Sequence, residues 1–549
     1  MTMDLTRRTR TEVLLLVAFC GFLFFYGLGS FGLLGADEPR YAQVAREMLE
    51  RHDWITPTLQ GKPWLEKPPL YYWQAMASYR VGRAFLPAKD QDNDGVTDQA
   101  ARLPAAIDAT LMIAAIYFFL RRFRPGSEVD GALITAGSAA VIGFAHAAAT
   151  DMPLAAAFTV ALLGWYAWHE TGKRIHLAAF YIFLALGTLA KGPVAPALAA
   201  AIILIFAAAR RDWHAAFATL WIPGIALFLA VALPWYVAVQ LRNPEFFRVF
   251  ILEHNFARFS QNVYHHRQPF WFYIPVLLLS LMPWTLWLIL AIVERVRLIW
   301  SEGKGAVSNS EDSWQLFLLI WLLVPVVFFS ASQSKLPGYI LPAIPAGALL
   351  VSEYLAARRT EETRISLSLA AAHGALCGLL VFGALSAASI QLNHRLAWGT
   401  GTVIFAAIAA VFALGIAAAL LSRNGLRLLR SATMIAIVVS VGDILHRAAP
   451  VMDATQSARP IAGKIQAFSH EPVPIAIYHI SRVQEYGLEF YLNRPAQDYE
   501  VGDVPTEAHV LVAAHNTQPR VAQFVRGRRV SYLTSIPAQK LDLYWVGKE

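Results

Sequence analysis

Apolar blocks of roughly 20 residues recur along most of this chain, and an α-helix needs about that length to cross a lipid bilayer. The first block follows a basic N-terminus and runs from about Thr11 to Leu34. Further blocks begin near Leu103, Gly131, Leu154, Leu177, Val194, Ala215, Phe270, Trp314, Ile340, Ser366, Thr402 and Ala432. The pattern predicts about 13 transmembrane helices, the first too long to be the apolar core of a signal peptide. It excludes a soluble enzyme, a nucleic-acid-binding protein and a secreted scaffold as descriptions of the whole chain.

The low share of charged residues supports a membrane location. Charged residues make up 15% of the 549 positions, whereas a soluble domain has about 25%. The net charge of +8 comes from short basic clusters between the apolar blocks, which fits contact with membrane lipids better than with nucleic acid. Cys20 and Cys377 both lie inside apolar blocks, which argues against a disulfide framework or a cysteine metal site.

Alternate connections between the apolar blocks are rich in arginine and lysine, and the positive-inside rule places such connections in the cytoplasm. They are Arg121–Arg124, Lys173–Arg174, Arg210–Arg211, Glu294–Arg297, Arg358–Arg359 and Arg423–Arg430, together with the N-terminal Arg7, Arg8 and Arg10. Because the predicted number of spans is odd, the C-terminal segment is expected on the outer face of the membrane.

The regions expected on the outer face include a C-terminal tail that resembles a folded domain. Its runs PVPIAIYHI, HVLVAAH and LDLYWVG are typical of strands, and ARPIAGKIQAF and QPRVAQFVRG are typical of helices. We therefore predict a transmembrane domain at 1–449 and a small α/β domain at 450–549. The transmembrane domain includes a first outer loop at 35–102, with interfacial helices, and a second at 242–269.

Two aspartates precede prolines at positions where outer-face helices are expected to begin. Asp37 opens the segment ADEPRY, and Asp151 lies in TDMP. Spacing alone favours an N-cap role, in which the carboxylate accepts backbone N–H bonds. The alternative is a pair of reactive carboxylates, since charged residues gather at the outer ends of the spans rather than at mid-membrane, where a transporter would place them.

Further polar residues of the outer loops have open interpretations. Glu66 and Lys67 precede a double proline and an aromatic run, which suits either an interfacial anchor or a site for phosphate and a metal or sugar. The second loop carries His254, Arg258, His265, His266 and Arg267, which face headgroups by default and could bind zinc. The segment from Ser332 to Tyr339 offers a cation and a hydroxyl beside a turn.

An acidic segment in the first loop imitates part of a calcium-binding loop. DQDNDG begins at Asp90 and is followed by Asp98, but loop position 12, where an EF-hand has glutamate, is Ala101. A solvated acidic loop is therefore the favoured interpretation, with weak calcium binding as the alternative.

Six motifs in a fixed order give the chain a family likeness. They are GADEPRYAQVAREM, LEKPPLYYW, TDMP, LAKGPVAP, EHNFARF with HHRQPFWFY, and SKLPGYILPAIPA, and together they span roughly Leu14 to Pro345. This set resembles the bacterial ArnT-like lipid A glycosyltransferases, relatives of the protein O-mannosyltransferases with the GT-C fold. The DQDNDG insertion is not part of that family's pattern. The tail shows no motif of the family either, which leaves the acceptor open.

The resemblance implies a glycosyltransferase of the bacterial inner membrane. Such an enzyme moves a sugar, here 4-amino-4-deoxy-L-arabinose as candidate, from undecaprenyl phosphate to a lipid A phosphate at the periplasmic face, with inversion and without a nucleotide cofactor. The alternative enzyme is a mannosyltransferase-like protein that uses a polyprenyl-phosphate sugar and acts on another envelope glycan or protein. The other classes are a lipid-linked sugar flippase and a non-enzymatic envelope assembly protein.

The resemblance also assigns roles to individual residues. Asp37 and Asp151 correspond to the two acidic catalytic positions. A divalent metal ion would be held by Glu66 with His265 or His266. The donor phosphate and substrate would be bound by Arg40, Tyr41, Lys67, Lys191, Arg258, Lys335 and Tyr339.

Overall fold

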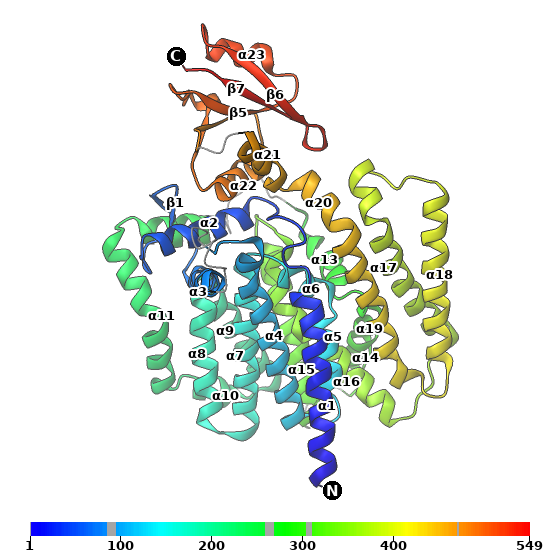
Figure 1. The fold of residues 1–549 in the computed structure, drawn as a ribbon. Coiled ribbons are helices and arrows are strands. Elements are labelled where there is room, and N and C mark those ends of the chain that lie inside the picture. Colours follow the sequence, from blue (N-terminus) through cyan, green and yellow to red (C-terminus); the bar gives the residue numbers. More distant parts are fainter. Residues whose placement is uncertain (1, 85–94, 258–267, 303–309, 469–471, 549) are drawn as a thin grey trace.

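A computed structural model describes residues 2–84, 95–257, 268–302, 310–468 and 472–548. They form a bundle of long helices that carries a small α/β domain on one end, called here the domain-facing end, and the N-terminus lies at the opposite end (Figure 1). This confirms the predicted fold class of a helical membrane protein with a C-terminal α/β domain.

The helices of the bundle are α1 (Thr2–Cys20), η1 (Gly21–Phe25), α4 (Asp98–Phe123), α5 (Glu128–Ala136), α6 (Ala139–Ala145), α7 (Asp151–Thr171), α8 (Arg174–Lys191), α9 (Val194–Arg210), α10 (Trp213–Thr219), α11 (Ile222–Arg242), α13 (Tyr273–Ser280), α14 (Thr285–Glu302), α15 (Ser310–Ala331), α16 (Ile344–Thr360), α17 (Leu367–Asn393), α18 (Thr400–Leu421) and α19 (Gly425–Asp443). Most of these helices follow one another with short connections, and longer segments separate η1 from α4 and α11 from α13.

Shorter segments form the domain-facing end. They are α2 (Asp37–Glu50), β1 (Thr58–Leu59), β2 (Lys62–Pro63), α3 (Leu70–Ala84), η3 (Phe247–Ala257), η4 (Phe270–Phe272), η6 (Pro337–Ala343), η7 (Ile444–Ala448) and α20 (Ala449–Gln456). Helices α2 and α3 lie in the region 35–102, for which the sequence predicts interfacial helices.

Eight helices in the described ranges are long and apolar enough to cross a membrane, or up to ten when each of two bent helix pairs counts as one span. One bent pair is α5 with α6, at 62°, and the other joins η4 and α13 to α14, at 117°. Some hydropathy blocks of the sequence correspond to shorter helices, such as α9 with 17 residues. The total of about 13 spans therefore stays a prediction.

Ion pairs join the arginine-rich connections at the end of the bundle opposite the C-terminal domain. Asp130, at the start of α5, is 1% exposed and pairs with Arg359 of α16 and, at 2.9 Å, with Arg430 of α19. Arg124, just after α4, pairs with Glu170 near the end of α7. Arg124, Arg359 and Arg430, from three of the basic clusters that the sequence places on one membrane face, thus lie at one end of the bundle.

The C-terminal domain is built on a five-stranded sheet with the order β4-β3-β5-β7-β6. Strands β3 (Ile475–Tyr478), β4 (Ala496–Asp498) and β5 (His509–Ala514) are parallel, whereas β7 (Leu541–Val546) runs antiparallel to β5 and to β6 (Val530–Ile536). Helices α21 (Arg459–Phe468) and α22 (Arg482–Leu492) cover one face, and α23 (Gln518–Phe524) covers the other. Short 3-10 turns η8 (Tyr499–Val501) and η9 (Pro537–Gln539) complete the domain. The three runs predicted as strands are β3, β5 and β7.

Helix α22 attaches this domain to α2 of the first outer loop (Figure 1). Gln43 Nε2 donates a hydrogen bond to Asn493 Oδ1 at 3.1 Å, and Arg46 Nη1 donates to the carbonyl of Phe490 at 2.6 Å. The Arg46 guanidinium also lies 4.8 Å from the Phe490 ring centroid. The C-terminal domain therefore packs against α2, the helix that begins with Asp37.

Candidate active site

The two Asp-x-Pro motifs begin helices at the domain-facing end of the bundle. Asp37 is the first residue of α2, and Asp151 is the first residue of α7. Glu38 Oε1 accepts a hydrogen bond from the backbone N–H of Ala148 at 2.7 Å. This bond ties the start of α2 to the segment that leads into α7, so the structure brings the two motifs to one region.

The backbone contradicts the capping role that spacing favoured for these aspartates. The N-cap residues are Ala36 and Thr150, one position earlier, and neither forms a side-chain capping bond. Asp37 and Asp151 are therefore already inside their helices, where a carboxylate still gains from the partial positive charge of the helix N-terminus.

Each carboxylate instead has a cation as its partner. Asp37 pairs with Arg40 one turn along α2, and its side chain is 52% exposed. Asp151 Oδ1 accepts a hydrogen bond from Lys191 Nζ, at the end of α8, at 2.5 Å. The Asp151 side chain is only 17% exposed. One aspartate is thus open to solvent, while the other is held in a tighter pair.

Aromatic rings surround the guanidinium of Arg40. Its carbon lies 5.4 Å from the ring centroid of Tyr41, 4.9 Å from that of Trp64 and 5.5 Å from that of Tyr486. Tyr486 belongs to α22, so the C-terminal domain contributes to this site. Tyr41 is itself buried in the core between α2 and α3.

The charge of Arg40 is stabilised by its neighbours in spite of burial. Burial alone would lower the pKa of Arg40, but Tyr41, Asp37 and Glu66 raise the pKa above its ordinary value. Its Nε is buried and has no hydrogen-bond partner within the described residues. A permanently charged, partly unsatisfied guanidinium next to an exposed carboxylate is suited to bind an anionic group such as phosphate.

Glu66 lies beside His254 of η3. The distance from Glu66 Oε1 to His254 Nε2 is 3.8 Å, and both side chains are at most 20% exposed. The partners expected for Glu66, His265 and His266, fall outside the described residues, as does Arg258. Within the described ranges no three His, Cys, Asp or Glu residues cluster in a metal-binding arrangement.

Lys191 and Asp151 share their surroundings with the start of η6. Lys191 Nζ lies 5.0 Å from the ring centroid of Tyr339. The neighbouring Gly338 packs so closely that a Cβ atom there would lie 2.7 Å from both Asp151 Oδ1 and the Phe144 ring. The SKLPGY motif therefore places a glycine where any side chain would displace the Asp151 carboxylate.

Lys335 of the same motif holds the chain in place. Its side chain is buried, and Nζ donates to the carbonyls of Ser332 at 2.5 Å and Gln268 at 3.1 Å. These bonds fix the loop between α15 and η6 to the segment before η4.

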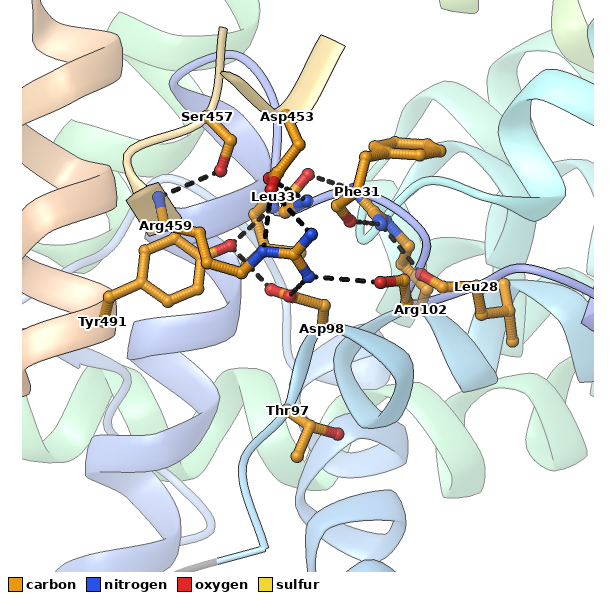
Figure 2. Close-up of polar contacts among 12 residues, drawn as sticks. Leu28, Phe31, Leu33, Thr97, Asp98, Arg102, Asp453, Ser457, Arg459 and Tyr491 are labelled. Atoms are coloured by element: carbon orange, nitrogen blue, oxygen red, sulfur yellow. Dashed lines mark hydrogen bonds and ion pairs between the residues drawn. The ribbon is translucent and has the colours of Figure 1, made fainter. Parts of the chain in front are cut away.

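A buried ion pair between α4 and α2 fixes the start of α2. Arg102 of α4 is fully buried and donates to Glu38 Oε2 at 2.8 Å and Oε1 at 3.2 Å. It also donates to the carbonyls of Leu28, Phe31 and Gly32, at 2.9, 2.7 and 2.9 Å, as Figure 2 shows in part. The backbone that leads into Asp37 is therefore held by one guanidinium.

The network continues from α4 into the C-terminal segment (Figure 2). Arg459 Nη1 lies 3.0 Å from Asp98 Oδ2, and Arg459 Nη2 lies 2.8 Å from Asp453 Oδ2. The Tyr491 hydroxyl donates to Asp98 Oδ1 at 2.7 Å. Asp98 thus serves interdomain contacts, while the preceding residues 90–94 of the calcium-like segment lie outside the described ranges.

Comparison with known proteins supports the likeness found in the motifs. Residues 66–237 match the family described as dolichyl-phosphate-mannose-protein mannosyltransferase. The undecaprenyl phosphate-α-4-amino-4-deoxy-L-arabinose arabinosyl transferases of Pseudomonas aeruginosa and Edwardsiella ictaluri are each 30% identical, over 357 and 379 residues. These matches cover 64% and 68% of this chain, and they span only 60% and 63% of the length of the two relatives.

A solved structure matches nearly the whole chain. ArnT from Cupriavidus metallidurans, bound to undecaprenyl phosphate, superposes with a TM-score of 0.75 at 22% identity and covers 97% of both chains. The chain has the ArnT fold. The apo structure of the Cupriavidus metallidurans protein gives a TM-score of 0.73. The ArnT-like resemblance expected from the six motifs is confirmed, and the match includes the C-terminal α/β domain.

Proposed function

We propose that this ArnT-like protein is a membrane glycosyltransferase that uses a sugar linked to undecaprenyl phosphate. The observation that carries the proposal is the pairing of two helix-start aspartates with Arg40 and Lys191 at the domain-facing end of the bundle. In such a pair the carboxylate can act on the acceptor, and the cation can stabilise the phosphate leaving group. The names of the relatives make 4-amino-4-deoxy-L-arabinose the first sugar to test.

The proposed chemistry is direct displacement with inversion at the anomeric carbon. The bond between sugar and phosphate is already activated, so the reaction needs no nucleotide cofactor and no covalent intermediate. Lys191 and Arg40, which ion pairs position before the reaction starts, would stabilise the charge that develops on the leaving polyprenyl phosphate together with Lys67.

The role of Asp37 depends on the acceptor. A hydroxyl acceptor must lose its proton, and the exposed Asp37 carboxylate would then act as the general base. A lipid A phosphate, which is our first choice of acceptor, is already an anion at neutral pH. Asp37 would then orient the acceptor or stabilise positive charge on the sugar ring.

Glu66 and His254 are the residues through which a divalent metal ion would act, if the reaction uses one. A carboxylate and an imidazole 3.8 Å apart supply two ligands of the types that divalent cations bind. An ion held there would supply positive charge to balance the donor phosphate.

The proposed location is the bacterial inner membrane with the C-terminal domain in the periplasm. The arginine-rich connections and the C-terminal domain occupy opposite ends of the bundle (Figure 1). Because basic connections stay in the cytoplasm, the N-terminus would lie inside and the candidate active site outside.

The test is a transfer assay with the purified full chain in lipid nanodiscs. Undecaprenyl-phosphate aminoarabinose and lipid A are supplied, and mass spectrometry follows the addition of the sugar to lipid A phosphate. Asp37→Asn should abolish product formation, while Glu50→Gln, at the other end of the same helix, should retain it. Movement of the donor between leaflets without a new glycosidic bond would support the flippase instead. A metal chelator, followed by Mg²⁺ or Mn²⁺, tests the metal proposal separately.

A further inference from the structure

A polar pocket of about 370 Å³ opens where α2 and α11 end, and it shares no lining residue with the candidate active site. It is lined by Arg51, His52, Asp53, Trp54, Ile55 and Arg242. Arg242 is the last residue of α11, and the other five follow α2 directly. The pocket therefore lies at the level where a membrane-spanning helix leaves the apolar part of the bundle.

The cations of this pocket outnumber its acidic groups. Asp53 pairs with Arg242 at 2.9 Å and with Arg51 at 3.7 Å, and these two arginine side chains are 53% and 45% exposed. The guanidinium of Arg80 lies 5.1 Å from the ring centroid of Trp54 and adds a third positive charge. Asp53 is thus the one carboxylate of the lining against two guanidinium groups, with a third guanidinium near the ring of Trp54, which leaves capacity for an anion.

Hydrogen bonds hold Asp53, the partner of both arginines, and its loop in place before any ligand arrives. Asp53 Oδ1 accepts from the backbone N–H of Ile55 at 2.9 Å and of Thr56 at 3.3 Å, which fixes the carboxylate within its own turn. Trp235 Nε1 of α11 donates to the carbonyl of Ile55 at 3.0 Å, and Trp73 Nε1 of α3 donates to that of Trp54 at 2.8 Å. A site that is ordered beforehand loses less entropy on binding.

An apolar groove runs along α11 and ends next to this pocket. It has a volume of about 510 Å³ and is lined by Leu229, Ala230, Leu233, Pro234, Val237, Ala238 and Leu241. Leu241, the last lining residue, is 78% exposed and immediately precedes Arg242. Helix α11 lies at the edge of the bundle (Figure 1), and its groove therefore faces the lipid. An apolar groove that leads to an arginine pocket matches a lipid with an anionic head.

We propose that this surface binds a membrane phospholipid whose phosphate lies between Arg51 and Arg242 and whose acyl chain follows the α11 groove. Guanidinium groups bind phosphate oxygens in a forked geometry, and the exposed Trp54 suits the headgroup layer. Because the lining holds two arginines and one aspartate, its excess positive charge favours an anionic head over a zwitterionic one, whose cationic group it repels. This inference does not depend on the transferase activity.

Native mass spectrometry of the full chain, released from detergent with defined amounts of phosphatidylglycerol or phosphatidylcholine, tests the proposal. The wild type should retain phosphatidylglycerol in preference to phosphatidylcholine. The double variant Arg51→Gln/Arg242→Gln should bind phosphatidylglycerol about tenfold more weakly, which corresponds to the loss of about 1.4 kcal/mol. The matched control Arg520→Gln/Arg526→Gln removes the same charge from the C-terminal domain and should bind as the wild type does.

A second variant separates the lipid from a free anion and from misfolding. Ala230→Phe narrows the groove without touching an arginine, so it should weaken binding of long-chain phosphatidylglycerol and leave the short-chain dihexanoyl lipid unaffected. Equal melting temperatures of all variants exclude a folding defect. Unchanged phosphatidylglycerol binding by the arginine double variant, or displacement of the lipid by millimolar inorganic phosphate, would overturn the proposal.

Discussion

The side chain of Lys191 pairs with Asp151 at 2.5 Å and lies over the ring of Tyr339. In the proposed reaction it has two tasks, which are to neutralise Asp151 and to contact the donor phosphate. Lys191→Met keeps the length of the side chain and removes its charge. We expect kcat to fall by about 100-fold or more, the effect of losing one pre-positioned electrostatic contact to a developing anion. The measurement is steady-state transfer to lipid A phosphate, with Lys464→Met on the C-terminal domain as control.

A donor-binding measurement on a double variant distinguishes the two tasks of Lys191. If the lysine only balances the charge of Asp151, Lys191→Met/Asp151→Asn should bind undecaprenyl phosphate as the wild type does, since no unpaired carboxylate remains. If Lys191 also contacts the donor phosphate, as proposed, the double variant binds it as weakly as Lys191→Met does. Wild-type affinity of the double variant would therefore contradict a direct role in donor binding.

Glu489 gives a second prediction at the residue scale, and it concerns stability. Burial, and to a smaller extent the nearby Glu485 and Glu47, raise the pKa of Glu489 from 4.5 to about 8. The folded protein then holds this proton more tightly than the unfolded chain does. The contribution of the group to stability is therefore greatest below pH 4.5 and is lost as the pH rises through about 8.

Glu489→Gln removes this titration and keeps a carbonyl oxygen for the N–H of Ala496. The melting temperatures of the variant and the wild type should be similar near pH 5. At pH 9 the variant should melt at the higher temperature, because the wild type then buries a charged carboxylate between the first loop and the C-terminal domain. Thermal unfolding followed by tryptophan fluorescence between these pH values provides the test, and parallel curves would refute it.

The elements that carry the candidate site depend on close backbone approach, most clearly at η6. Gly338→Ala would place a Cβ atom 2.7 Å from Asp151 Oδ1 and from the Phe144 ring, closer than side-chain carbons approach their neighbours. We expect activity to fall at least about tenfold through displacement of Asp151, with the melting temperature lowered by only a few degrees. Gly463→Ala, in an open position of α21, is the control and should retain full activity.

The helix boundaries near the site show why the N-cap role predicted from motif spacing for Asp37 and Asp151 was wrong. An aspartate two residues before proline is a common helix cap, yet here the chain enters α2 and α7 one residue earlier. The reason lies outside the motif, since Glu38 is drawn toward Arg102 and Ala148, and Asp151 toward Lys191. Local propensity was outweighed by buried ion pairs between elements.

The arrangement of the whole molecule predicts which residues are accessible from each side of the membrane. Both native cysteines, Cys20 and Cys377, are buried, so a single added cysteine is the main target of a thiol reagent. In intact cells a membrane-impermeant maleimide that crosses the outer membrane should label Asp503→Cys in the C-terminal domain. It should not label Lys173→Cys, between α7 and α8, until the inner membrane is opened. The reverse pattern would invert the proposed topology.

The sequence by itself determined the membrane location, the α/β character of the tail and the family likeness. Long apolar blocks and alternating strand and helix runs are local properties, and short motifs keep their order along the chain. The tertiary structure decided which charges meet. The structure pairs residues from distant segments: His254 lies beside Glu66, Tyr486 beside Arg40, and Arg102 beside Glu38. No local pattern encodes such pairs, because burial of a charge has a cost that only the packed bundle, with a partner in reach, can offset.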